Sequence, residues 1–560
     1  MNKRAPSNGE SIKRKCLKRL KSLQDVRNSW DPQWRSIGRL MSPRLGRFTV
    51  EETNRGEAKH GDILDNVALL SYRTLAQGMM SGMTSPARPW FKLTLSDEAL
   101  ADSSSVKQWL EDVTKMMRRV FQDSNTYRAL HSMYEELALF GTAASFMVQD
   151  DEKVVRHYPL TIGEYWVSAN HKGEIDTLYR RIQKTAYELV DEFGVGNVSN
   201  SVRYAYERGS KDKPIVVIHA VEPNRSRDVS KQDAQNMAWR SVYFEEKGDG
   251  DKLLRVSGFK RFPVLCARWA VTGNDVYGCS PGMDALGDVG QLYAMTEAHV
   301  VAVQRLVDPP LLISSSLKDQ ILDTNPGAQN PVSGVANENA CVPINAGPIN
   351  LDHLSRQIAL IEQRIREAFY VDMFLIISGN DNTQMTATEV AERREEKMMM
   401  LGPVVERLQS ELLNPLIDLT FDYMAQAGKL PDPPEELLDQ DYKVELVGMM
   451  AQSQQAIEAN AVTRLIASTL QVAEAKPEVL DKLDQDALVD VLAHAYGVSP
   501  SIVRPTDEAN KLRAQRAQAQ QAMQQAAMQN QAADTAEKLA RAKTGEDNLL
   551  AREMGQFSGY

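Results

Sequence analysis

The sequence contains few cysteines, and no two of them lie close together. Cys16, Cys266, Cys279 and Cys341 are isolated along the chain, and no CxxC pair occurs. Zinc knuckles need such pairs, and disulfide frameworks need several cysteines at short spacings, so neither is supported. We therefore expect reduced, partly buried thiols.

Long apolar runs are also missing. No run approaches the roughly 18 residues that a membrane-spanning helix requires, and the N-terminal segment lacks the apolar stretch of a signal peptide. We therefore expect the protein to be made in the cytoplasm and to have no stable membrane span. With 560 residues, 42% hydrophobic and 25% charged, the composition is that of an ordinary soluble globular protein with two to four packed units.

Motifs of catalysis and of cofactor binding are absent. The sequence has no GxxxxGK[ST], GxGxxG, HExxH or GxSxG pattern, so we expect no cofactor and no enzymatic activity. His131 and Glu135 have the spacing of metal ligands on a helix, but no third ligand is near, and a surface hydrogen bond is the simpler interpretation. The acidic run 150–152 could hold a divalent ion or form an exposed turn, and its position between strands favours the turn.

An excess of positive charge is missing as well. The chain has 65 Lys and Arg against 75 Asp and Glu, a formal net charge of -10. Proteins that hold nucleic acid tightly usually carry the opposite balance. A static clamp on nucleic acid is therefore disfavoured, although DNA as a transient partner is not.

The basic charge that is present concentrates near the N-terminus. Residues 11–30 contain many Lys and Arg, with Ile12, Leu17, Leu20 and Leu23 on roughly one side of a predicted helix. Such a helix can bind a membrane or an acidic partner, or it can pack its apolar side on its own domain. Packing on its own domain is the favoured interpretation.

The rest of the pattern predicts a mainly helical α+β protein. Apolar periodicity and turn residues predict helices over 62–82, 105–121, 126–140 and 184–193, and strands over 90–95, 144–148, 165–169, 178–182, 215–221, 242–245 and 264–269. From Ser280 onward helices dominate, and Ser280-Pro281 has the residues of a helix start.

Two helical segments with narrow apolar stripes frame an insert rich in proline, glycine and asparagine. Spacings of three and four align Leu286, Val289, Tyr293, Thr296, Val300, Val303 and Val307 in the first segment, and Leu351, Leu354, Ile358, Ile361, Ile365 and Ala368 in the second. Each stripe is suited to packing against another helix. Because Pro309 and Pro310 end the first helix, we expect a helical hairpin that carries a protruding module.

A polar loop and further helices follow. Thr386 with Glu389 forms a capping-box pattern, so a new helix begins there, kinks at Gly402-Pro403 and ends near Gly428. The segment 507–543 has no Gly or Pro and is dominated by Ala and Gln. It could be a solvated helix, a partly disordered tail, or one helix in a ring of identical helices.

Several phrases, taken in order, resemble the head-to-tail connector (portal) family of short-tailed bacteriophages. They are GMTSPARPWF at 82–91, LYRR at 178–181 with Phe193-Gly194, Arg268-Trp269, YGCSPG at 277–282, VDPP at 307–310 and MTATEV at 385–390. The resemblance spans about residues 50–435.

The resemblance implies a portal fold with an α/β wing, a two-helix stem, a clip and a helical crown. Its parts would be the wing at 1–280, stem helices at 281–307 and 351–373, the clip at 308–350, a tunnel loop at 374–386, a long kinked wing helix at 387–440, the crown at 441–505 and a C-terminal helix, barrel or tail at 506–560. Rings of this family typically have twelve subunits and sit at one capsid vertex, where DNA enters and leaves through the channel. The resemblance also implies a terminase motor, tail adaptor proteins, and major capsid and scaffolding proteins as partners, with the protein in the virion after assembly in the host cytoplasm.

Residue roles follow as expectations. Candidates for lining the channel are Arg305, Lys318, Arg356, Arg364, Arg366, Asn380, Asp381, Asn382 and Gln384, and candidates for stem packing are Leu286, Val289, Tyr293, Val300, Val303, Leu354, Ile358, Ile361 and Ile365. The arginines could instead form ion pairs with Glu362 or Glu367, and the polar loop could be an ordinary solvated connection. An interaction or scaffold protein that self-associates without a portal function is the alternative.

Overall fold

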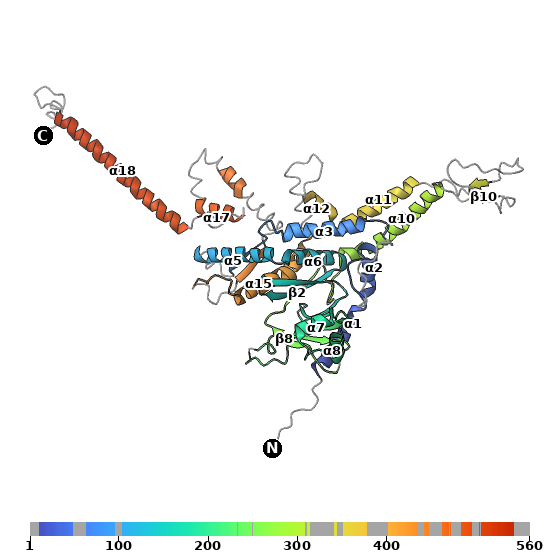
Figure 1. Ribbon diagram of the computed structural model, residues 1–560. Helices are drawn as coiled ribbons and strands as arrows, with labels where there is room; N and C mark the ends of the chain where they lie inside the picture. Colours follow the sequence, from blue (N-terminus) through green and yellow to red (C-terminus); the bar gives the residue numbers. More distant parts are fainter. Residues whose placement is uncertain are drawn as a thin grey trace, which may run out of the picture. The chain divides into compact units, whose positions relative to one another are not determined.

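The structure is a computed structural model, shown in Figure 1. It describes residues 11–48, 63–95, 104–231, 233–248, 250–307, 311–313, 341–343, 351–377, 401–434, 442–446, 462–469, 471, 483–495, 503 and 506–541. The chain divides into two compact units, one made of 1–96 and 109–453 and the other of 97–108 and 454–560.

The first unit begins with helices that pack on sheet and helix alike. They are α1 (Ile12–Arg27), α2 (Asp31–Met41), α3 (Val67–Met83), α5 (Ser104–Asp123) and α6 (Thr126–Phe140). The apolar side of α1 is covered from within, because Cys16, Leu20 and Leu23 are buried against Trp166 and Tyr179 of the sheet. The favoured interpretation of the basic N-terminal helix is thereby confirmed.

A five-stranded antiparallel sheet forms the larger β part, in the order β4-β5-β6-β7-β8. Its strands are β4 (Tyr165–Ala169), β5 (Ile175–Thr185), β6 (Pro214–Pro223), β7 (Trp239–Glu245) and β8 (Arg255–Phe259). Two short helices, α7 (Ala186–Phe193) and α8 (Asn200–Glu207), pack apolar residues against β6 and β7. A capping box between Thr185 and Glu188 begins α7.

Among the described residues, three smaller strand arrangements accompany this sheet. A three-stranded sheet has the order β3-β2-β9, with β2 (Thr142–Asp150) central between β3 (Val154–Leu160) and β9 (Val264–Arg268). β1 (Phe91–Leu95) pairs with β12 (Tyr442–Leu446), and β10 (Leu311–Ile313) pairs with β11 (Cys341–Pro343), both antiparallel.

The remaining helices of the first unit are α9 (Pro281–Asp284), α10 (Leu286–Val307), α11 (Leu351–Ala368), α12 (Val371–Ile377), α14 (Gly402–Leu408) and α15 (Asn414–Gln426). A π-helical turn, Gln409–Leu413, connects α14 to α15. Pro415 explains this turn, because proline has no N–H for the carbonyl of Glu411 and its ring crowds that carbonyl. The second unit contains α17 (Gln485–Ala495) and α18 (Thr506–Arg541).

The predicted α+β, mainly helical class is confirmed, and most of the predicted helices and strands through 307 are present. The second hairpin helix differs from its predicted extent, because α11 ends at Ala368 and α12 begins at Val371. Tyr370 has a φ of 55° between them, a left-handed backbone that ends a helix. Its ring lies beside Trp269, with 6.2 Å between the centroids, and Phe369 is fully buried, so tertiary contacts hold the break.

Candidate functional site

The predicted helical hairpin is the most distinctive feature of the first unit. α10 and α11 lie side by side and run in opposite directions, and the short β10–β11 pair follows at their far end (Figure 1). With 22 and 18 residues, the two helices are about 33 Å and about 27 Å long at about 1.5 Å per residue. The hairpin therefore has a base near α9 and an outer half towards β10.

The chain enters the hairpin through a close contact between two backbone segments. At Gly141, which ends α6 with a φ of 73°, an added Cβ would lie 2.2 Å from the carbonyl oxygen of Gly278. At Gly278, an added Cβ would lie 2.4 Å from the carbonyl oxygen of Gly141. Only glycine fits at both positions. The Gly278 N–H donates to Thr142 Oγ1 at 2.8 Å, which fixes the contact from the side.

Ser280 fastens the next turn in two ways. Its hydroxyl donates to the carbonyl of Leu139 at 2.7 Å and accepts from the Met283 N–H at 3.1 Å. The second bond caps α9, with Pro281 in its first turn, as the sequence predicted. The start of the hairpin is therefore bonded directly to the end of α6.

Aromatic packing supports the same place. The Tyr277 ring is fully buried against Trp30 and Trp34, with centroids 6.1 Å and 5.1 Å away. Its hydroxyl accepts from the Val167 N–H at 3.3 Å. Burial raises the pKa of this phenol, so it stays neutral. The phrase 277–282, which carried part of the family resemblance, thus forms a structural joint.

At the base of the hairpin the apolar stripes are covered within the chain itself. Val289, Leu292 and Tyr293 of α10 and Ile361 and Ile365 of α11 are all buried. The Tyr293 hydroxyl approaches the carbonyl oxygen of Leu40 and lies 3.3 Å from that of Asp65. Desolvation, with a smaller effect of Asp65, raises the pKa of this hydroxyl to about 12. The base is thereby tied to the end of α2 and to the segment before α3.

The outer half of the hairpin is not covered. Val300 is 46% exposed, Val303 37% and Val307 81%, and Leu360 on the facing helix is 54% exposed. Val301 and Leu306, outside the predicted stripe of α10, are also exposed, at 38% and 53%. Scattered exposed apolar residues are common, but several of them gathered on one half of a hairpin are characteristic of an interaction surface. We call Val300, Val303 and Val307, together with Leu360, which the sequence placed in neither stripe, the outer stripe.

The predicted stem-packing residues therefore fall into two groups. Val289, Tyr293, Ile361 and Ile365 are buried inside a single chain, and Leu286, Leu354 and Ile358 are partly buried. Val300 and Val303 remain exposed. Sequence reasoning missed Leu292, which is fully buried and lies three positions after Val289, a spacing that could have identified it.

The predicted channel residues that the structure describes also differ from one another. Arg364 pairs with Asp288 of α10 at 3.5 Å, and Arg366 pairs with Glu362 at 3.9 Å on the same helix. Arg305 and Arg356 are exposed, and within the described ranges neither has a carboxylate partner. Lys318, Asn380, Asp381, Asn382 and Gln384 lie outside the described residues.

A buried ion pair ties the π-helical turn to the sheet near the joint. Arg268 of β9 is 5% exposed, and its guanidinium contacts both carboxylate oxygens of Glu411, the shortest distance being 2.5 Å. The Arg268 backbone N–H adds a bond to Glu411 at 3.0 Å, and its side chain also donates to the carbonyls of Gly173 and Asp275. No sequence spacing indicates this pairing, because its members are far apart in the chain.

Features that could indicate a metal or a nucleophile are accounted for within the described residues. No group of three or more His, Cys, Asp or Glu gathers there as ligands would. Asp150 instead accepts from the backbone N–H groups of Glu152 and Lys153 in the turn between β2 and β3. Cys16, Cys266 and Cys279 are free thiols, and burial raises the pKa of Cys266 to about 12. Across the same part of the chain, no helix is both long and apolar enough to cross a membrane.

Comparisons with known proteins agree with one another. Residues 13–503 match the model of the family described as bacteriophage head to tail connecting protein. The chain is 47% identical over 552 residues to the probable portal protein of Bordetella phage BPP-1, covering 98% of this chain and 100% of that protein. It is 38% identical over 542 residues to the portal protein of Salmonella phage epsilon15, covering 97% and 98%. A chain from the virion of a native gene transfer agent is 12% identical, with a TM-score of 0.35 over 76% of this chain and 90% of that one. This similarity is too low to support an argument.

Proposed function

This chain belongs to the family of bacteriophage head-to-tail connecting proteins and has a portal function, and from this premise we propose that its copies form a closed ring around a DNA channel. The ring would occupy one vertex of the capsid in the virion. Twelve copies is the number we propose, on the resemblance to the family. Assembly would take place in the host cytoplasm.

The outer stripe is the single observation that supports this ring best. The base of the hairpin is rooted in its own chain by buried apolar residues, whereas the outer half of α10 leaves apolar surface exposed at Val300, Val303 and Val307 and, outside the stripe, at Val301 and Leu306. Covering apolar surface releases about 25 cal/mol per Å². In a ring, the outer stripe of each copy would meet a different surface of the next copy, and the same contact would repeat until the ring closes.

The parts of the ring follow the predicted segments. We assign the wing to 1–280, the stem to 281–307 and 351–373, the clip to 308–350 and the tunnel loop to 374–386. The long wing helix would occupy 387–440, the crown 441–505 and the C-terminal helix 506–560. The α10–α11 hairpin and the rooted joint at its base support the stem assignment.

A channel that transports DNA must not bind the DNA phosphates tightly. A net charge of -10 suits passage, because each retained phosphate contact would add to the barrier against sliding. Among the predicted cations, Arg305 and Arg356 have no carboxylate partner in the described residues and are the strongest candidates for contacting DNA. Arg364 and Arg366, already paired with Asp288 and Glu362, would contribute less.

We further propose roles for the clip and the tunnel loop and for the proteins that would bind the ring. We assign Lys318 to the clip, and Asn380, Asp381, Asn382 and Gln384 to weak contact with passing DNA. Terminase and tail adaptor proteins would dock on the ring, and major capsid and scaffolding proteins would surround it during assembly. The protein would act as a conduit and a docking site without catalysing a reaction.

Substitution in the outer stripe tests the ring. Val300→Glu places a charge on the surface that a neighbouring copy would cover, so it should shift the protein from rings to monomers. Native mass spectrometry reports both populations. The matched control is Val195→Glu, since Val195 is similarly exposed at 43% but lies beside α7, away from the hairpin. If both variants assemble as well as the unsubstituted protein, the outer stripe is not a subunit contact.

A self-associating scaffold without portal function is the alternative. It rests on the basic N-terminal helix and on the Ala/Gln-rich α18. The apolar side of α1 is covered by its own sheet, and the family match extends over residues 13–503. The alternative is therefore not favoured.

A further inference from the structure

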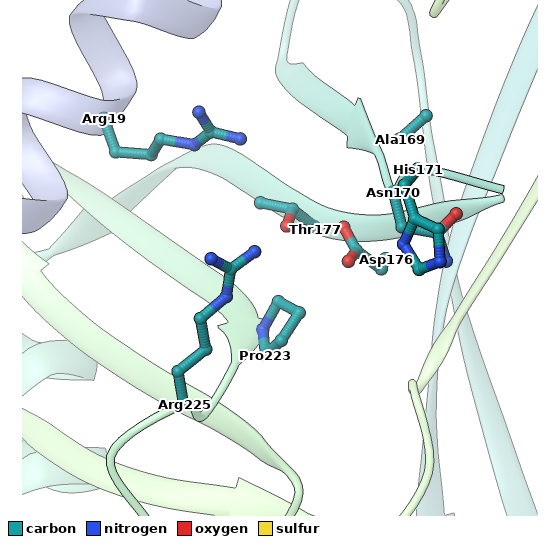
Figure 2. A pocket seen from close by; sticks show the side chains of 8 residues that line it. All are labelled: Arg19, Ala169, Asn170, His171, Asp176, Thr177, Pro223 and Arg225. Atoms are coloured by element: carbon teal, nitrogen blue, oxygen red, sulfur yellow. Dashed lines mark hydrogen bonds between the residues drawn. The ribbon is translucent and has the colours of Figure 1, made fainter. Parts of the chain in front are cut away.

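A hollow of about 380 Å³ lies where α1 meets the ends of β4, β5 and β6 (Figure 2). Cationic and hydroxyl-bearing side chains from separate elements line it, and its full lining is Arg19, Ala169, Asn170, His171, Asp176, Thr177, Pro223 and Arg225. Figure 2 shows the head groups of Arg19 and Arg225 entering this space from different sides, with Thr177 and Asp176 between them. Its volume is that of a site for a small ligand or a few side chains.

The two arginines carry charge that is not balanced by an ion pair. The Arg19 guanidinium donates to the hydroxyl of Ser168 at 2.9 Å, which directs its head group. Within the described part of the chain, no carboxylate forms an ion pair with Arg19 or Arg225. By contrast, Arg181 and Arg240 on the same sheet pair with Glu246 and Glu222. The hollow thus brings together two guanidinium groups that have no ion-pair partner among the described residues.

The carboxylate of Asp176 narrows the choice of ligand. It accepts the Thr177 hydroxyl at 2.9 Å and has further lone pairs for an N–H donor. A guanidinium binds a carboxylate with two parallel hydrogen bonds. A ligand that fits all three groups offers carboxylates to Arg19 and Arg225 and an N–H to Asp176.

We propose that this hollow binds an acidic peptide segment of a partner protein. A peptide supplies both carboxylates and backbone N–H groups. Nucleic acid fits less well, because it offers a continuous row of phosphates and gains affinity by contacting many of them. Asp176 would repel such a row at its centre. The site is separate from the hairpin and does not depend on the ring.

Fluorescence anisotropy at low ionic strength tests the site with a fluorescein-labelled peptide in which glutamate alternates with glycine. The full-length protein should bind the peptide, and Arg19→Gln/Arg225→Gln should weaken binding at least tenfold. Arg225→Gln alone should weaken it about threefold, and this variant removes no ion pair among the described residues. The matched control, Arg119→Gln, removes one positive charge from an exposed arginine of α5 and should leave binding unchanged.

Three results would overturn the proposal. The first is no binding of the glutamate–glycine peptide by the unsubstituted protein. The second is equal weakening by the control, which would indicate attraction to positive charge in general. The third is equally tight binding of a labelled oligothymidylate or full displacement by millimolar inorganic phosphate, since either shows that the hollow accepts any anion. Variants are compared only where their circular dichroism spectrum and oligomer mass match those of the unsubstituted protein.

Discussion

Glu136 of α6 lies in the interior of the protein, and the residue is only 4% exposed. The Thr161 hydroxyl donates to one carboxyl oxygen at 2.5 Å and the Ile162 N–H donates to the other at 3.0 Å. Desolvation outweighs these bonds and raises the pKa of Glu136 from 4.5 to about 8. The folded protein therefore holds this proton more tightly than the unfolded chain.

That difference makes stability depend on pH. The contribution of Glu136 is fully present below about pH 4.5 and is lost as the pH rises towards 8. Glu136→Gln keeps one acceptor and one donor but does not titrate, so this part of the slope should vanish. The free energy of unfolding of the unsubstituted protein should fall relative to the variant by on the order of a few kcal/mol across the window. Urea unfolding at a series of pH values measures it, and parallel curves would refute the assignment.

The contact between Gly141 and Gly278 gives a second test at this scale. Gly141→Ala would place a methyl group 2.2 Å from a carbonyl oxygen in a backbone with a φ of 73°, so we expect several times the roughly 1–2 kcal/mol cost of left-handed alanine alone. Gly209→Ala is the control, because Gly209 has a φ of 83° but nothing within 4 Å. Thermal unfolding should show a large loss only in the first variant. Equal losses of thermal stability in the two variants would mean that the backbone around Gly141 and Gly278 can shift to accommodate the methyl group.

At the scale of elements, local patterns predicted most helices and strands, and distant contacts explain what they missed. β12 pairs with β1 from the other end of the first unit, and no short window of sequence contains both. β3 contains Pro159 and β8 contains Gly258, residues that weaken a strand pattern. The alternation of threes and fours predicted the hairpin. It could not predict which half is covered, because the covering residues come from α2, from α3 and from the segment before α3.

In the candidate site, too, local features could be predicted from the sequence and contacts between distant segments could not. Ser280-Pro281 could be identified from its residue types, because a helix cap is local. The pairing of Arg268 with Glu411 could not, because β9 and the π-helical turn meet only in the folded chain. The sequence also could not predict that the two arginines of the hollow lie close together, because one comes from α1 and the other follows β6.

The buried Arg268–Glu411 pair connects β9 to the π-helical turn, and its removal should loosen that turn. Their side chains are 6% and 17% exposed, and breaking a buried pair by removing one partner costs about 3–5 kcal/mol. Arg268→Met should therefore speed amide hydrogen exchange across 409–413. The double variant Arg268→Met/Glu411→Leu should recover much of the protection, because no unpaired charge remains. A double variant as unprotected as the single one would show that the charges are not what holds the turn.

At the scale of the whole molecule, the acidic balance and the uncovered outer stripe have one explanation in common. In the ring that we propose, neighbouring copies would cover the apolar stripes, and a net charge of -10 on each copy would keep DNA from binding firmly as it passes. Family membership identifies the portal function, whereas the subunit contact rests on four exposed residues of the hairpin.

Electron microscopy of the purified full-length protein tests this account most directly. We expect closed rings with cyclic symmetry, with α10 and α11 of each copy packed against the next copy and a central opening that admits a DNA duplex. Particles that lack rotational symmetry, or rings whose subunits touch only through other segments while Val300, Val303 and Val307 stay exposed, would contradict it.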